Sequence, residues 1–305
     1  MDRRKEVTDN FQNRLRDGIV LLDGAMGTEL LRRGVPTKLP LWSAAALLEA
    51  PEVVQSIHAD YIAAGADVIT TNTFRTNVRV VEYPGSQHSA RELTLRAAEL
   101  ALTAREESGV PGVLVAGGLA PVEDCYEPMR VPPTEALLAE HLVVAKTLQE
   151  SGVDFIFSET MNSISEAVAT AEVSDSVGLP LAMSLVCDQE GNLLSGESLT
   201  ELVSSIAKYS PLFLAVNCRA PEVIDVALAK LSASAGDIPV GVYANGIGKP
   251  DDEDGWKFPE GLDFAAQQYL EHAKKWHLAG AKVIGGCCGT TPEYIAALRD
   301  EFIAR

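Results

Sequence analysis

The chain has 305 residues, of which 47% are hydrophobic and 22% charged, a composition typical of a globular protein with a large core. Its formal net charge of -18 argues against binding to nucleic acid or to anionic membrane surfaces. No stretch approaches the ~20 apolar residues of a membrane-spanning helix, and no apolar secretion signal follows the charged N-terminus. Five cysteines, two of them adjacent, do not form a disulfide framework. We therefore expect a cytoplasmic protein.

Apolar runs of strand length alternate with amphipathic helical patterns along the chain. The eight predicted strands cover residues 19–22, 67–71, 113–116, 154–157, 181–185, 212–218, 239–243 and 282–284. Helices are predicted over residues 53–64, 92–107, 135–149, 163–176 and 264–278, among others. Strands that are apolar on both faces and alternate with helices favour a parallel sheet.

Eight such strand–helix units predict an α/β fold, a TIM-type (β/α)8 barrel. We assign residues 1–305 to this single domain, with residues 1–17 as an N-terminal helical extension. An open, doubly wound sheet is the alternative. The segment after the first strand, Gly24-Ala25-Met26-Gly27-Thr28, does not favour that alternative because it lacks the dinucleotide-binding pattern G-x-G-x-x-G.

Polar residues follow many of the predicted strands. In a TIM-type barrel the C-terminal ends of the strands form the active site. A single Asp before Gly is often only a turn former, and a Glu before a helix often only favours the helix dipole. The indication of an enzyme therefore comes from the convergence of several strand-end residues. These residues are Asp23, Asn72, Thr73, Glu159, Asn217 and Asn245.

Two adjacent cysteines, Cys287 and Cys288, lie between glycines just after the last predicted strand. Neighbouring side chains of a regular strand point to opposite faces, so both thiols can reach one point only if the backbone turns, which the glycines permit. We predict that this point is a metal ion and that Cys218, after the sixth strand, is the third ligand. Three thiolates leave a tetrahedral zinc one open position, as in catalytic sites. The alternative is that the cysteines are small buried hydrophobes.

A zinc with an open position predicts alkyl transfer to a thiol, because the metal binds a substrate thiol as thiolate and makes it a nucleophile at neutral pH. A cationic alkyl donor needs an aromatic or acidic pocket. Candidates are Phe74, Tyr126 and Trp256, and ordinary loop packing is the alternative for each. The long loop at residues 246–261 either covers the site or is a solvated excursion. Packing or surface positions are expected for Cys125, Cys187, His58, His88, His141, His272 and His277.

Four segments resemble the zinc-dependent homocysteine S-methyltransferases, in the same order along nearly the whole chain. They are residues 23–30, 71–74, 216–218 and 285–292. The resemblance implies a TIM-type barrel, with zinc on Cys218, Cys287 and Cys288 and the sulfur of homocysteine at the open position. It further implies that Asp23 and Glu159 hold the amino group of homocysteine. Asn72, Asn217 and Asn245 are expected pocket residues, and Ala244 stands where many family members have Pro.

The methyl donor is less sharply indicated than the acceptor. Residues 40–43 and 245–256 look most like single-module members that use S-methylmethionine, whereas residues 71–74 are more similar to the cobalamin-dependent synthase module. We expect homocysteine as acceptor, methionine as product, and S-methylmethionine or S-adenosylmethionine as donor. The alternatives are a betaine-type onium donor and a methyl-acceptor module that works with a separate corrinoid protein.

Two other classes of protein are less consistent with the sequence. A barrel lyase or aldolase usually needs a lysine at a strand end, but Lys282 begins its predicted strand. A non-catalytic zinc or redox protein is the other possibility, and a structural zinc normally has four protein ligands. No fourth cysteine or histidine lies at an obvious place for one.

Overall fold

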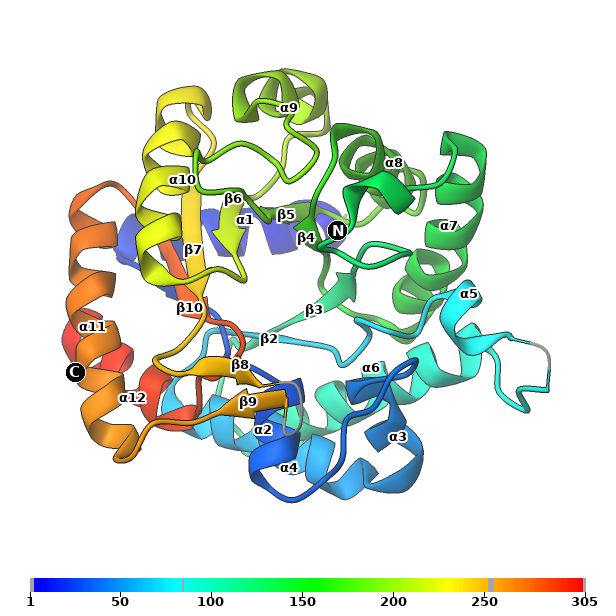
Figure 1. Cartoon of the computed structure of the whole chain (residues 1–305), viewed down its shortest axis with the longest axis horizontal. Helices are drawn as coiled ribbons and strands as arrows, with labels where there is room; N and C mark the ends of the chain where they lie inside the picture. The colour runs from blue at the N-terminus through cyan, green and yellow to red at the C-terminus, as the bar shows by residue number, and fades with distance from the viewer. Residues whose placement is uncertain (1–2, 84, 252–254, 304–305) are drawn as a thin grey trace.

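The computed structural model describes residues 3–83, 85–251 and 255–303 (Figure 1). Its main sheet is parallel, in the order β1-β10-β7-β6-β5-β4-β3-β2. Those strands are β1 (Val20–Leu21), β2 (Val68–Thr70), β3 (Leu114–Leu119), β4 (Phe155–Met161), β5 (Leu181–Leu185), β6 (Leu214–Asn217), β7 (Val240–Ala244) and β10 (Val283–Gly286). A parallel bridge between Leu22 and Val68 joins the two ends of the sheet. The predicted TIM-type barrel is therefore confirmed, and the open doubly wound alternative is wrong.

Helices surround the barrel and alternate with its strands. The longer ones are α4 (Pro51–Ala64), α6 (Ala90–Ser108), α7 (Thr134–Ser151), α8 (Ile164–Ser176), α9 (Leu199–Ile206), α10 (Pro221–Ser234), α11 (Leu262–Leu278) and α12 (Pro292–Phe302). Shorter helices are α2 (Gly27–Arg32), α3 (Ala46–Glu49) and α5 (Val78–Val81). Helices α4 and α7 end at Gly65 and Gly152, whose φ angles of 103° and 83° lie in the left-handed region that glycine adopts without strain. The chain can therefore turn sharply from each helix into the next strand.

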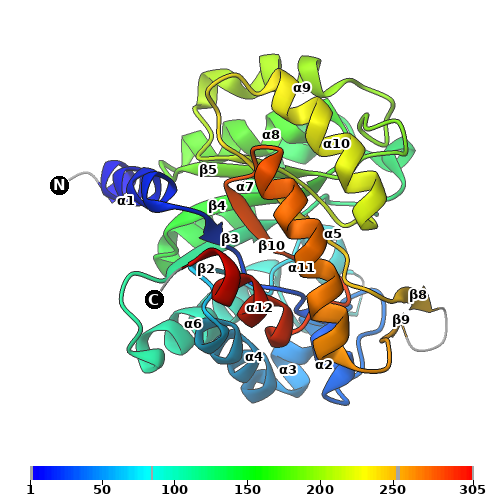
Figure 2. The same ribbon diagram turned by 90° about the vertical axis from the view of Figure 1, so that its left-hand side faces the viewer.

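Helix α1 (Arg3–Asp17) lies across the end of the barrel at which the strands begin. Its Phe11 is fully buried, stacks on Phe213 at 5.4 Å and meets Phe155 edge to face at 6.1 Å. Phe155 is the first residue of β4, and Phe213 immediately precedes β6 (Leu214–Asn217). Figure 2 shows α1 on the opposite side of the barrel from strands β8 and β9. Helix α1 therefore packs against the N-terminal end of the barrel, opposite the end at which active sites of this fold lie.

Strand β3 continues through Gly117 and Gly118, beyond the predicted end of the strand at residue 116. A Cβ atom on Gly117 would lie 2.9 Å from the Leu148 side chain of α7. A Cβ atom on Gly118 would lie 2.9 Å from Oε1 of Glu159. Both glycines thus allow close approach, the first of a helix outside the barrel and the second of a carboxylate inside it.

The loop predicted at residues 246–261 contains a short antiparallel hairpin of β8 (Lys249–Asp251) and β9 (Gly255–Lys257). Residues 252–254 lie outside the described part of the chain. Among the described helices, none combines the length and the apolar character that crossing a membrane requires.

Candidate functional site

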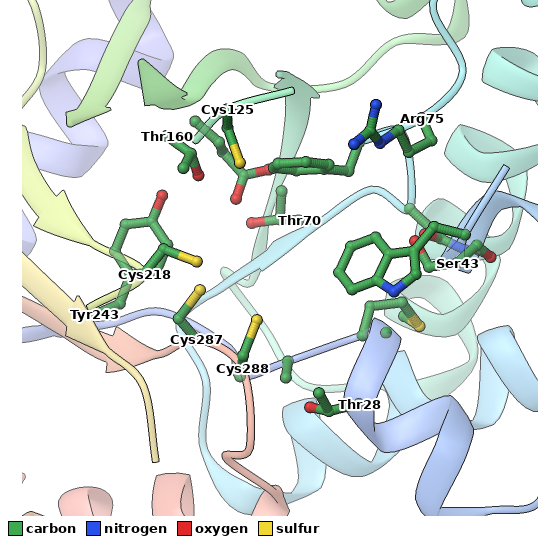
Figure 3. A pocket seen from close by; sticks show the side chains of 18 of the residues that line it. Thr28, Ser43, Thr70, Arg75, Cys125, Thr160, Cys218, Tyr243, Cys287 and Cys288 are labelled. Carbon is green, nitrogen blue, oxygen red and sulfur yellow. Dashed lines mark hydrogen bonds between the residues drawn. The ribbon is translucent and has the colours of Figure 1, made fainter. Parts of the chain in front are cut away.

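A cavity of about 340 Å³ lies at the C-terminal ends of the strands (Figure 3). The residues at its wall come from the ends of six strands and from the loops that follow them. They include Asp23, Thr70, Asn72, Phe74, Arg75, Asp124, Cys125, Tyr126, Glu159, Cys218, Tyr243, Cys287 and Cys288, with Trp42 from the loop after α2. Strand-end residues from distant parts of the sequence therefore converge, as expected for this fold.

Three cysteine sulfurs meet at one side of this cavity (Figure 3). The Sγ atoms of Cys218, Cys287 and Cys288 all lie within 4.8 Å of one another. Cys218 follows β6 with a φ of 57°, a left-handed conformation that is uncommon for a residue with a side chain. Its amide donates to the carbonyl of Tyr243 at 3.3 Å, and the amide of Cys287 donates to the carbonyl of Ala244 at 2.8 Å. Strand β7 thus holds both cysteine segments in place.

The turn after β10 is fixed on several sides. The amide of Gly246 donates to the carbonyl of Cys288 at 2.8 Å, and the amide of Gly289 donates to Oγ1 of Thr28 at 2.8 Å. Gly289 has a φ of +78°, and a Cβ atom there would lie 2.2 Å from the ring of Trp256. Trp256 is buried against this turn and is not among the residues of the cavity wall. The hairpin therefore covers the back of the cysteine turn, and Trp256 does not line a donor pocket.

The three thiols are electrostatically coupled. Hydrogen bonds from Cys287 and Cys288 lower the pKa of the Cys218 thiol, and the hydroxyl of Tyr126, 2.9 Å from its sulfur, acts in the same direction. The pKa values of the Cys287 and Cys288 thiols are raised, mainly because these thiols donate the hydrogen bonds to Cys218 and also because both are partly removed from solvent. The cluster therefore loses its first proton readily and its next ones only with difficulty. A cation would remove that difficulty, so the triad is suited to hold a metal.

No histidine, aspartate or glutamate joins the three cysteines in the part of the chain that the structure describes. Cys125 lies in the cavity wall, and it is buried, as is Cys187. Two of the histidines, His58 and His141, are also buried, and His141 contacts Glu166 at 3.0 Å. None of the five histidines is among the described residues of the cavity wall.

Two carboxylates share the cavity with the thiols. Asp23 follows β1, and its side chain accepts hydrogen bonds from the amide and hydroxyl of Thr70 at 2.8 and 3.4 Å. Burial raises the pKa of Asp23 to about 7, although the hydrogen bonds from Thr70 oppose the shift. Burial also raises the pKa of Glu159, on β4, to about 8, and the nearby charge of Asp23 adds to this effect. An ammonium group placed between them would favour the ionised form of both.

The three predicted asparagines lie in different places. Asn72 lines the cavity, and its Nδ2 donates to the carbonyl of Ser43 at 2.9 Å. Asn217 and Asn245 are not in the cavity wall. The side-chain Nδ2 of Asn217 donates to Oγ1 of Thr160 at 2.9 Å. Because Thr160 is part of the cavity wall, Asn217 supports that wall from behind. A direct contact of Asn217 or Asn245 with a substrate is therefore not favoured by their positions.

Aromatic side chains form another part of the wall. Phe74 and Tyr126, two of the sequence candidates, line the cavity. Trp42, which sequence reasoning did not single out as a pocket residue, meets Phe74 edge to face with ring centroids 5.8 Å apart. Tyr243 and Arg75 were also missed. The inward-facing alternation of β7 was the signal that could have revealed Tyr243, whereas Arg75 has no such signal because it lies in a loop.

Comparison with known proteins agrees with this arrangement. The chain matches the homocysteine S-methyltransferase family model over residues 20–302. It is 33% identical to homocysteine S-methyltransferase from Escherichia coli, over 92% of this chain and 94% of that protein. It is 29% identical to selenocysteine Se-methyltransferase from Brassica oleracea var. italica, over 94% of this chain and 90% of that protein.

Among solved structures, the metallated form of the homocysteine methyltransferase MmuM from Escherichia coli is similar, with a TM-score of 0.78 and 32% identity. The match covers 92% of this chain and 96% of that chain. The family model and the relative that is 33% identical each span most of the sequence. The chain therefore belongs to the homocysteine S-methyltransferase family.

Proposed function

We propose that this protein transfers a methyl group from a small onium donor to the thiol of homocysteine, giving methionine, with zinc held by Cys218, Cys287 and Cys288. One observation carries the proposal. The triad of thiols opens onto the same cavity as two carboxylates, the buried Asp23 and the partly buried Glu159. This pairing fits a substrate that has a thiol at one end and an ammonium group at the other.

The donor set fits zinc. Thiolates are soft ligands that zinc prefers, and three protein ligands leave a tetrahedral ion one position for a substrate. The coupled triad also needs a cation before all three of its thiols can ionise. When bound, zinc supplies the positive charge that lowers the pKa of a substrate thiol to near neutrality.

The residues of the chain position the acceptor. Asp23 is held by Thr70 with its carboxylate at the cavity, and Glu159 approaches from β4. Together they would bind the ammonium of homocysteine and so exclude thiols that lack an amino group. Because the pKa values of these carboxyl groups are about 7 and 8, binding of the ammonium would be accompanied by loss of protons.

The aromatic wall suits a cationic donor, since Trp42, Phe74 and Tyr126 can stabilise an onium group through their ring faces. Homocysteine reacts as the thiolate, after its thiol proton has been released to solvent, and its sulfur attacks the donor methyl carbon to form one carbon–sulfur bond. The bond between that carbon and the onium atom breaks, and its electron pair stays on the leaving group, which departs neutral. Alignment of the two reactants is then the main contribution of the protein. S-methylmethionine and S-adenosylmethionine fit this description, and glycine betaine is the alternative.

The test is formation of labelled methionine by the zinc-loaded protein from homocysteine and a donor with a trideuterated methyl group. S-methylmethionine, S-adenosylmethionine and glycine betaine are assayed separately by mass spectrometry. We expect turnover with at least one of them and none with Cys218→Ser. Zinc-loaded protein that uses none of the three would contradict direct transfer from an onium donor.

A further inference from the structure

The cavity contains one arginine that neither the zinc site nor the binding of the homocysteine ammonium uses. We propose that Arg75 binds the carboxylate of the methyl donor, so that the enzyme selects onium donors that carry an acid group. This inference rests on the proposed function and deepens it. Arg75 follows Phe74 in the loop after β2 and lines the same cavity as the cysteines.

The charges in the cavity make Arg75 exceptional. Its described wall includes three acidic side chains, those of Asp23, Asp124 and Glu159, and Arg75 is the only lysine or arginine among the described wall residues. An anionic group is disfavoured elsewhere in such a cavity, because it would face carboxylates and thiolates. Arg75 is therefore the one position in the described wall that attracts an anion.

Arg75 makes no hydrogen bond or ion pair with any residue that the structure describes, and its Nε is buried without a partner. Asp124 lies in the same wall, but its Oδ1 accepts a hydrogen bond from the amide of Tyr126 at 2.8 Å instead. Arg79, four residues later, pairs with both Glu123 and Glu140. A buried N–H group that is left unpaired is costly, and a ligand carboxylate would satisfy it.

The position of Arg75 indicates how a methyl donor lies in the cavity. In Figure 3, Arg75 lies across the cavity from the sulfurs of Cys218, Cys287 and Cys288. The reacting methyl group must lie near these sulfurs, where the thiol of the acceptor is held. A donor that spans the cavity then places its opposite end near Arg75. A guanidinium group binds a carboxylate through two parallel hydrogen bonds, so a zwitterionic onium acid matches both ends.

The carboxylate of homocysteine is the competing ligand for Arg75. It is attached to the same carbon as the ammonium, which we place at Asp23 and Glu159 on other strands. Kinetics distinguish the two ligands, because loss of Arg75 affects the KM of only the substrate that it contacts.

The experiment compares S-methylmethionine with its carboxamide, which keeps the sulfonium and the size but lacks the negative charge. Both donors are assayed with wild type, Arg75→Met, Arg75→Lys and a matched control, Arg91→Met, which removes an exposed arginine of α6. Zinc content and thermal unfolding are measured for each variant. Glycine betaine and its amide replace this pair if betaine is the donor that the wild type uses.

We expect the wild type to prefer the acid over the amide, and Arg75→Met to lose that preference through an increase of about 10- to 100-fold in the KM of the acid. The KM of Arg75→Lys for the acid should lie between those of the wild type and Arg75→Met, and Arg91→Met should have the KM of the wild type. In all variants the KM of homocysteine should stay within about twofold of the wild-type value. The inference is overturned if Arg75→Met changes only the KM of homocysteine, or if wild type and Arg75→Met treat acid and amide alike. Failure of the wild type to use any donor would instead contradict the proposed function.

Discussion

Substitution of Asp23 by Asn tests how the acceptor is recognised. The asparagine side chain has nearly the same shape, and its oxygen can still accept the hydrogen bond from the amide of Thr70, which is 2.8 Å from Oδ2 in the wild type. The change therefore removes a charge and leaves the local geometry. Asp23 is only 9% exposed, so the ammonium it would bind is largely desolvated. Loss of one partner from a buried charge pair costs about 2–5 kcal/mol.

That cost corresponds to a decrease of about 30-fold or more in kcat/KM for homocysteine. The assay measures methionine formation with homocysteine and with 4-mercaptobutanoate, which has the same thiol and carboxylate but no amino group. We expect Asp23→Asn to lose most of the preference for homocysteine, to keep its zinc, and to leave the KM of the donor unchanged. The control is Asp60→Asn, which removes a surface carboxylate paired with Arg33. If zinc-loaded Asp23→Asn keeps the preference of the wild type for homocysteine, Asp23 does not bind the ammonium group.

Three further substitutions test other parts of the site and the fold. Tyr126→Phe removes the hydroxyl that lies 2.9 Å from Sγ of Cys218. We expect this variant to retain zinc while its kcat falls about 3- to 10-fold. An unchanged kcat would exclude a role for this hydrogen bond in catalysis. Gly289→Ala adds a Cβ atom 2.2 Å from the Trp256 ring, at a residue whose φ is +78°. The zinc affinity, measured by chelator competition, should therefore fall about tenfold or more. An unaltered affinity would show that the turn after β10 adapts to the added methyl group. Burial lowers the pKa of His58 to about 4 from 6.5, so the unfolded chain takes up a proton there between these pH values and the folded chain does not. The wild type should thus lose about 2 kcal/mol of its free energy of unfolding because of His58 between pH 7 and pH 5. Urea unfolding should show a smaller loss in His58→Met. Equal losses in the two proteins would contradict the lowered pKa of His58.

The barrel and the position of its site could be predicted because both depend on local patterns. Eight apolar runs separated by helices specify the closed parallel sheet. Once the strands are parallel, residues such as Asp23, Glu159 and Cys218 must gather at one end of the barrel, however far apart they are in sequence. The turn after β10 could also be predicted, because it depends on a local pattern of two adjacent cysteines between glycines.

The parts that the sequence did not reveal depend on contacts between loops. The aromatic wall includes Trp42, which reaches the cavity from the loop after α2, and its packing on Phe74 has no periodic signal. Trp256 was a candidate for the donor pocket, but the β8–β9 hairpin directs its ring against Gly289 instead. Arg75 is apparent only in three dimensions, because its lack of a partner is not a property of its sequence neighbours.

Titration of metal-free protein with zinc, while methionine formation from homocysteine is followed, tests whether zinc on the three cysteines supports methyl transfer. We expect activity to be absent without metal, to rise linearly with added zinc and to reach its plateau at about one zinc per chain. Conversion of Cys218, Cys287 or Cys288 to Ser should remove the zinc and the activity together. Full activity of the metal-free protein, or zinc binding that survives loss of these thiols, would contradict a catalytic zinc at the cysteine triad.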